Sequence, residues 1–350
     1  MKKILVMFTG GTIGSKKNNK LINVDESTAY YLLDKYMESG YARDVEFVTI
    51  QPLNILSENL IPNDWLIMYK CLIENNFQTY DGVIITHGTD TLPFSAAALS
   101  YMLNDTLIPV VITASNYPLE DDKSNGLKNF ISSVDFVLEK PACGVFVVYE
   151  NNKGEAIVHL GTRLTEAVPF TNEFYSINSL YFGKMINRKI SIIEHELNPT
   201  LDMLHLPRQK ANIPDVNYTS EILYIRPHPG LDYRYYNFAA RKPKAVLHGL
   251  YHSGTACTRD NEGFYSLVNF VKYCIDNSVD FYISPINVSG DLYLTSNSLI
   301  DAGAIPLQNI SLEAGLVKLM LAYGSFSNKE HIREFLNKNT LFFEDCQLVY

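Results

Sequence analysis

The stretch TGGTIGS, residues 9–15, directly follows the apolar run KILVMF of residues 3–8. Its glycines, threonines and serine fill no hydrophobic core, and a tight turn would need only one or two of the glycines. Glycine lets the backbone approach a ligand closely, and a threonine hydroxyl becomes a nucleophile when a neighbouring group takes its proton. A second stretch of this kind, THGTDT at residues 86–91, also follows an apolar run. We interpret the two as loops of one site.

Short apolar runs rich in β-branched residues recur along the first half of the chain and are separated by segments of helical period. Strands buried on both faces that alternate with helices are typical of a parallel sheet covered by helices. The sequence therefore predicts an α/β fold with a mostly parallel, doubly wound sheet. The predicted strands are residues 3–8, 45–50, 81–86, 108–113 and 143–149, with helices at 63–76 and 93–105 among those between them.

The chain of 350 residues is long enough for two domains. Residues 188–217 are irregular and polar and contain several prolines, so we predict that they link the domains. Residues 1–187 then form the N-terminal domain that carries the active site. The α/β pattern resumes in residues 218–350, which predicts a second, smaller α/β domain.

The composition favours small-molecule chemistry. Hydrophobic residues at 47% and charged residues at 19% are ordinary for a globular protein. A net charge of -9 without lysine or arginine clusters argues against a nucleic-acid partner. No apolar run approaches the roughly 18 residues that a membrane span needs, so we expect a cytoplasmic protein without a membrane partner. Five cysteines without a C-x-x-C spacing predict buried free thiols, and we expect no metal and no cofactor.

Ligands of open parallel sheets bind beyond the carboxyl ends of the strands. Since both glycine-threonine loops follow strands, Thr12 and Thr89 should face one crevice, with Asp90 as a neighbouring acid. One alternative is a purely structural turn. Another is a nucleotide-binding loop, which is disfavoured because the G-K-[ST] ending and the G-x-G-x-x-G spacing are both missing.

The pairing of TGGTIG with HGTDT resembles the L-asparaginase family. Four further blocks are similar to the bacterial cytoplasmic (type I) branch of that family: residues 81–103, 109–130, 244–255 and 294–319. The resemblance implies a hydrolase of a small-molecule amide that converts L-asparagine to aspartate and ammonia. It also implies a homodimer or a homotetramer.

The same resemblance assigns roles to residues of this chain. Thr12 matches the nucleophile, and Thr89 and Asp90 match the residues of the second motif that assist it. The positions that match the substrate-binding residues are Gly11, Ser57, Glu58 and Gly88, together with the backbone of Ala114 and Ser115.

The sequence departs from the family at several of these positions. The family has a lysine at the end of the pattern R-x-T-K, where this chain has Glu166. An ammonium group stabilises a developing alkoxide, whereas an ionised carboxylate destabilises it. Leu21 aligns with an assisting loop tyrosine of the family, although Tyr30 and Tyr31 lie nearby, and Thr255 stands where the family often has asparagine.

These departures leave three interpretations open. Plain hydrolysis of asparagine is the first. In the second, Glu166 lies beside Asp90, the two carboxylates share a proton, and the pair acts as general acid and base on a different amide. In the third, Glu166 pairs with an arginine and the protein is a non-catalytic ligand-binding or regulatory member of the fold.

Overall fold

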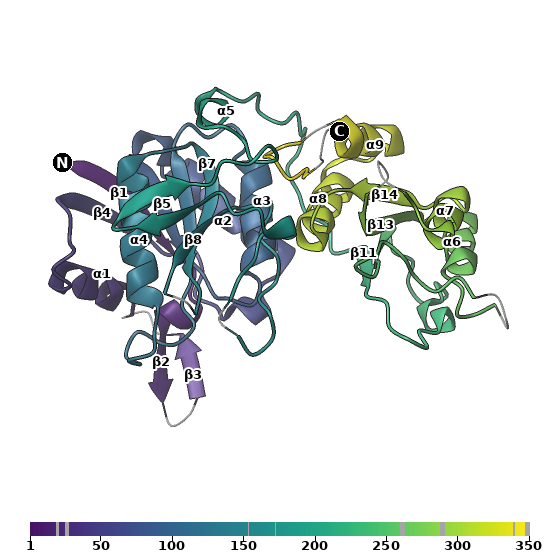
Figure 1. Ribbon diagram of the computed structural model, residues 1–350, viewed down its shortest axis with the longest axis horizontal. Helices are drawn as coiled ribbons and strands as arrows, with labels where there is room; N and C mark the ends of the chain where they lie inside the picture. Colours follow the sequence, from purple (N-terminus) through teal and green to yellow (C-terminus); the bar gives the residue numbers. More distant parts are fainter. Residues whose placement is uncertain are drawn as a thin grey trace. The chain divides into compact units, whose positions relative to one another are not determined.

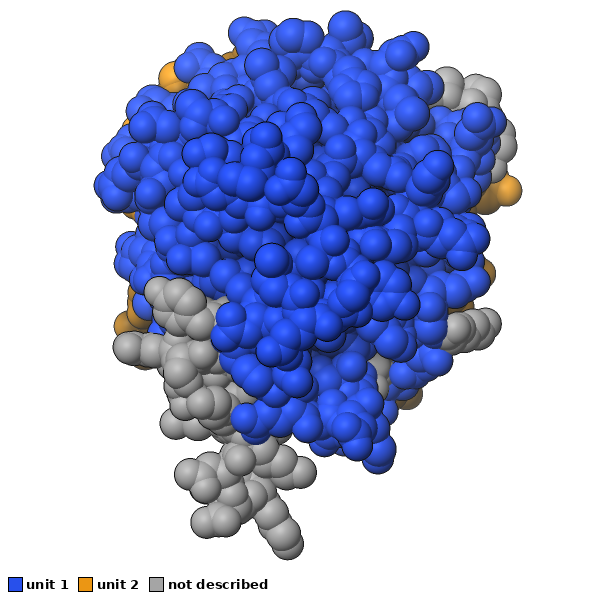
Figure 2. All heavy atoms as spheres, turned by 90° about the vertical axis from the view of Figure 1, so that its left-hand side faces the viewer, with its two compact units in different colours: residues 1–216, 341–343 blue, residues 217–340, 344–350 orange. Residues whose placement is uncertain are grey.

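A computed structural model describes residues 1–18, 21–24, 28–152, 154–171, 173–259, 263–287, 291–338 and 340–346, without the side chains of residues 14–30 and 338. The chain divides into two compact units (Figures 1 and 2). Unit 1 comprises residues 1–216 and 341–343, and unit 2 comprises residues 217–340 and 344–350.

Unit 1 is built on an eight-stranded sheet with the order β10-β9-β8-β7-β6-β5-β1-β4. The strands β4, β1, β5, β6 and β7 are parallel, and they coincide with the five predicted runs. Residues 4–8 are all buried, as expected for a strand with helices on both faces. The bounds are β1 (Lys2–Phe8), β4 (Val45–Ile50), β5 (Gly82–Thr86), β6 (Pro109–Thr113) and β7 (Gly144–Glu150).

Helices cover this sheet as the alternation of strands and helices predicts (Figure 1). Helix α4 packs on β5, β6 and β7, and α1 packs on α4. Helix α3 packs on β7 and is covered by α2. The bounds are α1 (Thr28–Glu38), α2 (Pro62–Glu74), α3 (Leu92–Met102) and α4 (Gly126–Glu139), with η1 (Thr12–Gly14), η2 (Ser57–Asn59), η3 (Phe77–Thr79), a small sheet β2 (Ser15–Asn18) and β3 (Leu21–Val24), and η4 (Ile177–Ser179).

Three antiparallel strands that we did not predict extend the sheet beyond β7: β8 (Ala156–Leu160), β9 (Gly183–Ile186) and β10 (Lys189–Ile192). Strand β10 and helix α5 (Leu201–His205) lie in the segment 188–217 that we predicted as a linker, and they belong to unit 1. Strands β9 and β10 are joined through Asn187 and Arg188, both with positive φ, 50° and 67°. A turn of this kind usually has the sequence Asn-Gly, but here Arg188 stands in the place of the glycine. Arginine rarely adopts a positive φ, so the sequence gives no signal of this hairpin.

The Arg188 side chain is held by a buried carboxylate of α4. Its Nε and Nη2 donate to Asp135 at 2.7 and 2.8 Å, and Arg43 Nε donates to the same carboxylate at 3.2 Å. The exposed fraction of Asp135 is only 2%, so the two guanidinium groups neutralise a charge that water does not solvate. This contact fixes the β9–β10 hairpin against α4.

Unit 2 contains a parallel sheet with the order β11-β12-β13-β14, in agreement with the predicted second α/β domain. Helix α6 packs on β13, and α8 packs on β11 and β13. A buried ion pair, Lys318 Nζ to Glu344 Oε1 at 2.8 Å, holds the segment after residue 343 on α8. The bounds are β11 (Ile222–Ile225), η5 (Tyr233–Tyr236), β12 (Ala245–Gly249), α6 (Leu267–Asp276), β13 (Asp280–Ile286), α7 (Leu294–Asp301), β14 (Ile305–Gln308), α8 (Leu312–Ser325) and α9 (Lys329–Lys338).

None of the five cysteines, all of which lie in described parts of the chain, forms a disulfide bond, although Cys257 is exposed rather than buried. Among the helices of the described residues, none has both the length and the apolar character that crossing a bilayer requires.

Three buried histidines predict how stability depends on pH. Burial lowers the pKa of His159 to about 3 and of His248 to about 4, from 6.5, and it also lowers the pKa of His87. Below the unfolded pKa the unfolded chain binds more protons than the native state. The free energy of unfolding should therefore decrease as the pH is lowered below 6.5, by up to about 1.4 kcal/mol per pH unit for each histidine.

Urea denaturation between about pH 7.5 and about pH 5 measures this slope. His159→Gln should flatten it, because the glutamine does not titrate, whereas His252→Gln at an exposed position should leave it unchanged. An unaltered slope in His159→Gln would contradict the assignment.

Candidate active site

The two glycine-threonine loops leave the same edge of the unit 1 sheet. Strands β1 and β5 are parallel neighbours with Phe8 opposite Thr86, so the residues after them emerge side by side. Thr9 Oγ1 donates to the Thr86 carbonyl at 2.8 Å and joins the two strand ends. The first loop is also paired with Ile55, whose carbonyl accepts from Gly11 N at 2.9 Å and whose N–H donates to the Thr9 carbonyl at 3.0 Å.

The two loops approach each other closely at Gly11 and Gly88. A Cβ atom on Gly11, which has φ +73°, would lie 2.6 Å from Gly88 Cα and 2.7 Å from His87 C. Only glycine fits there, because neither backbone can retreat. His87 Nδ1–H donates to the Gly88 carbonyl at 2.8 Å and orients it. Thr12 and Thr89, the next residue of each loop, thus start from adjoining backbones.

Ser57 brings a third loop into this contact. It is buried at the start of η2, and a Cβ atom on Gly88 would lie 2.6 Å from its Cβ. Ser57 Oγ accepts from Asp90 N at 3.3 Å, and its carbonyl accepts from Thr91 Oγ1 at 2.9 Å. Glu58, the next residue, is exposed. The hydroxyl of Ser57 therefore holds the second loop in place.

Ala114 and Ser115 follow β6, the strand beside β5, and both are fully buried. The Ala114 carbonyl accepts from Asn129 Nδ2 at 2.9 Å, and Asn129 Oδ1 accepts from Glu150 N at 2.7 Å. Asn129 of α4 therefore joins the ends of β6 and β7. Ser115 Oγ donates to the Tyr117 carbonyl at 2.5 Å, so this hydroxyl is used within its own loop.

A cavity of about 260 Å³ brings together Thr89, Asp90 and Glu166, three of the predicted catalytic residues. Neither Thr12 nor the predicted binding residues are among those that line it, although the Thr12 loop adjoins it through Gly88. The lining as described contains no lysine, arginine or histidine. It consists of Thr89, Asp90, Asn116, Tyr149, Glu166, Ala167, Val168, Pro169, Phe170, Thr171 and Phe174.

Glu166 reaches this cavity by way of a hairpin. Strand β8 runs antiparallel to β7, so the chain leaves β8 at the edge opposite the loops. An antiparallel bridge then pairs Leu164 with Ser176, so that the residues between them form a hairpin. Asn151, just after β7, exchanges two hydrogen bonds of 3.0 Å with the backbone of Phe174. This pairing fixes the returning segment at the carboxyl edge, where Glu166 joins Asp90.

Sequence reasoning identified three of the eleven lining residues, and Asn116 and Tyr149 are among those that it missed. Asn116 follows β6, so the rule that ligands bind beyond strand ends would have found it. Tyr149 belongs to the apolar run of residues 143–149 and was read as strand core. No signal in the sequence separates it from a core residue.

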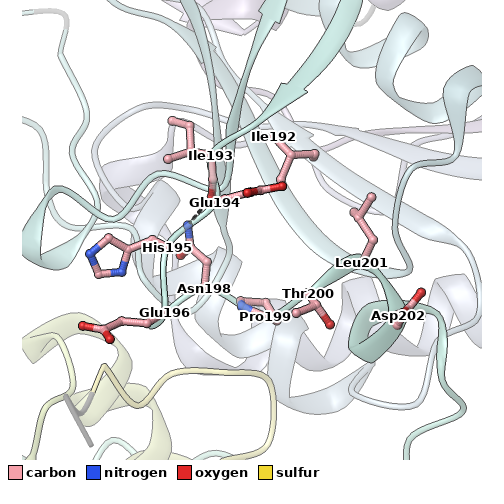
Figure 3. A pocket seen from close by; sticks show the side chains of 10 residues that line it. All are labelled: Ile192, Ile193, Glu194, His195, Glu196, Asn198, Pro199, Thr200, Leu201 and Asp202. Carbon is pink, nitrogen blue, oxygen red and sulfur yellow. Dashed lines mark hydrogen bonds between the residues drawn. The ribbon is translucent and has the colours of Figure 1, made fainter. Parts of the chain in front are cut away.

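A larger hollow of about 610 Å³ lies along Ile192–Asp202 and contains none of the predicted site residues (Figure 3). In this view His195 and Glu196 lie on one side and Asp202 on the other. Asn198 Nδ2 donates to the Ile193 carbonyl at 3.0 Å, a contact that shapes the segment itself. We assign the site to the smaller cavity because it lies at the carboxyl edge of the parallel strands and contains Thr89, Asp90 and Glu166. Among the described residues, no cluster of three His, Cys, Asp or Glu side chains is arranged to hold a metal ion.

Of the three residues considered for the role of the family's loop tyrosine, Leu21 and Tyr30 have side chains outside the described residues. The third, Tyr31, is partly buried in α1. Thr255 belongs to unit 2, where its hydroxyl lies 2.9 Å from Ser253 Oγ.

Replacement of Gly88 by alanine tests the contact between the loops. The added methyl group would overlap the Ser57 side chain and crowd Gly11 Cα at 3.3 Å, so we expect a loss of about 1–3 kcal/mol in the free energy of unfolding of unit 1, together with loss of ligand binding. Gly249→Ala is the control, because a Cβ there meets atoms no closer than 3.4 Å. Wild-type stability and binding in Gly88→Ala would contradict the described packing.

The fold and the site define a class: a two-unit α/β protein with glycine-threonine loops meeting at the carboxyl edge of its large sheet. Residues 3–198 match the family described as Asparaginase, N-terminal. The chain belongs to the asparaginase family of amide hydrolases.

Relatives of known name cover nearly the whole chain. The L-asparaginase of Thermococcus kodakarensis is 28% identical over 96% of this chain and 97% of its own. A glutamyl-tRNA(Gln) amidotransferase subunit from Methanococcus maripaludis is 26% identical over 97% of this chain and 80% of its own. The solved structure of the Thermococcus enzyme has a TM-score of 0.78 at 26% identity, covering 99% of this chain and 100% of that one.

The L-asparaginase I of Vibrio cholerae has a TM-score of 0.77 at 22% identity, with 99% of each chain covered, which is a likeness in fold. These structures confirm the predicted α/β fold. Relatives from archaea stand beside bacterial ones, so membership of the bacterial type I branch stays a prediction.

Proposed function

We propose that this protein hydrolyses the side-chain amide of L-asparagine to aspartate and ammonia, with Thr12 as the nucleophile. The observation that carries the proposal is the contact of Gly11 with Gly88, which joins the Thr12 loop to the loop of Thr89 and Asp90. The Thr12 hydroxyl attacks the amide carbon, ammonia leaves, and water cleaves the acyl-enzyme.

Proton transfer in the proposed reaction uses the cavity side chains. Asp90 and Glu166 line one cavity, and a carboxylate can take a proton from a hydroxyl or return one to a leaving amine. We assign this general acid-base work to the pair, with Thr89 as the hydroxyl between the carboxylates and the Thr12 loop. The route replaces the ammonium group that the family's lysine supplies.

The amino-acid part of the substrate carries an ammonium and a carboxylate. In the proposed complex Glu58 and Asp90 attract the ammonium, since opposite charges a few ångströms apart stabilise each other. Backbone groups of the loops carry the rest of the contacts. The residues assigned to this role are Gly11, Ser57 and Gly88, whereas the backbone of Ala114 and Ser115 is assigned to contact with the amide that is cleaved. We further propose that the protein acts in the cytoplasm as a homodimer or a homotetramer.

A second candidate follows from the similarity to an amidotransferase component over 97% of the chain. In that case the same chemistry would release ammonia for transfer by another protein. Release of ammonia from asparagine by the purified chain alone favours the hydrolase, and a panel of other amides distinguishes a different substrate.

Thr12→Ala tests the nucleophile. Without the hydroxyl no acyl-enzyme forms, so ammonia release from millimolar L-asparagine should fall by about 10³-fold or more. Thr12→Ser keeps a hydroxyl and should retain part of the activity. Circular dichroism and thermal unfolding of both variants should match the wild type, because Thr12 is partly exposed. Retained turnover in Thr12→Ala would remove the assignment.

Glu166→Gln tests the acid-base role. It keeps the shape of the side chain but cannot take a proton, so kcat should fall by about 10²-fold. Glu173→Gln is the matched control, because Glu173 belongs to the same hairpin but accepts from Tyr175 Oη at 2.6 Å and does not line the cavity. Unchanged amidase rates in both Glu166→Gln and Glu166→Lys would place Glu166 outside the proton route.

A further inference from the structure

Tyr149 has a buried hydroxyl that the described part of the chain leaves without a hydrogen-bond partner. The residue is the last but one of β7, and its exposed fraction is 0%. Its Oη makes no hydrogen bond with any described part of the chain. Leaving a buried hydroxyl unpaired costs about 1–3 kcal/mol, so a native protein rarely keeps one without a use.

The surroundings of Tyr149 point to a ligand. Its side chain forms part of the wall of the 260 Å³ cavity that also contains Asp90 and Glu166. Both of those groups accept hydrogen bonds when ionised, and the described lining offers no cationic donor. The Tyr149 hydroxyl supplies a neutral hydrogen-bond donor to this cavity, which has no cationic one among its described lining residues.

The hydroxyl keeps its proton near neutral pH. Burial raises the pKa of Tyr149 to about 12; the nearby Asn125 side chain opposes this rise, and the Glu150 carboxylate adds to it. No hydrogen bond of acceptable geometry joins Asn125 to the hydroxyl. An N–H group of the Asn125 side chain could in any case only donate to a lone pair of Tyr149 Oη. The O–H of Tyr149 would then still be free to donate.

The position of Tyr149 is fixed before any ligand binds. Its ring packs edge-to-face on Phe174 with centroids 4.8 Å apart. The following residue, Glu150, accepts at its carbonyl from Asn125 Nδ2 at 2.9 Å and donates its N–H to Asn129 Oδ1 at 2.7 Å. A donor held in this way can bind an acceptor without a loss of conformational entropy.

We propose that Tyr149 is a further substrate-binding residue, whose hydroxyl donates a hydrogen bond to the carbonyl oxygen of the amide that is cleaved. The ligand atom that accepts this hydrogen bond must be neutral, because the carboxylates of Asp90 and Glu166 would repel an anionic group. The inference rests on the proposed function for the identity of the ligand. Charge develops on this oxygen as Thr12 attacks, so the contact strengthens in the transition state.

Tyr149→Phe removes the hydroxyl and keeps the ring. Since the hydroxyl has no hydrogen-bond partner among the described residues, the thermal midpoint should stay the same or rise. Tyr36→Phe is the matched control: Tyr36 is equally buried in unit 1, but its Oη accepts from Arg43 N at 3.0 Å, so its midpoint should fall. A fall in Tyr149→Phe would show that the hydroxyl has a structural partner and would overturn the proposal.

Binding is measured by calorimetry in a Thr12→Ala background, which keeps the amide intact. Adding Tyr149→Phe should raise the Kd for L-asparagine about ten-fold. The Kd for L-2-aminobutyrate, which lacks the amide, should not change. With Thr12 present, kcat/KM should fall about 10²-fold. Tyr36→Phe should change none of these values.

The outcomes separate the two proposals. If Tyr149→Phe weakens the binding of both ligands equally, or of neither, the role of Tyr149 is overturned even if asparagine is hydrolysed. The absence of binding by L-asparagine overturns both proposals. A ligand-specific loss in a protein that hydrolyses no amide supports the contact and removes only the catalytic function.

Discussion

The site depends on a contact between two backbones, Gly11 after β1 and Gly88 after β5. Parallel pairing of the two strands sends both loops out at one edge, but pairing alone leaves room for side chains between them. The absence of a Cβ on either glycine closes that room, and the Ser57 side chain fills the remaining side. The backbones that carry Thr12 and Thr89 owe their proximity to this arrangement.

The parallel core could be predicted because its strands are short and apolar throughout, as β5 (Gly82–Thr86) illustrates with five buried residues in succession. The same rule predicts where the loops meet. The antiparallel extension could not be predicted: β9 and β10 are four residues each, partly exposed, and turn through Asn187 and Arg188, a pair with no recognisable hairpin signal. Arg188 tolerates that turn because Asp135 holds its guanidinium.

In the candidate site, too, some residues could be placed from the sequence and others could not. Thr89 and Asp90 follow a predicted strand, so their place in the cavity could be anticipated. The route of Glu166 could not, because it depends on the bridge between Leu164 and Ser176 and on the pairing of Asn151 with Phe174, contacts between residues with ordinary sequence patterns. Tyr149 has the pattern of a core residue, and what distinguishes it is its place in the cavity wall and a hydroxyl without a hydrogen-bond partner among the described residues.

The wall that carries Glu166 is a hairpin inserted between β8 and β9 and contains none of the crossovers that build the parallel sheet. Its residues 167–171 touch the cavity, and Phe170 at its tip is fully exposed. Mutations in this wall can alter what the cavity accepts while the Thr12 loop and the sheet beneath it stay intact. The architecture thus separates the evolution of selectivity from the maintenance of the scaffold, so a lineage can exchange one amide for another through changes in a single loop.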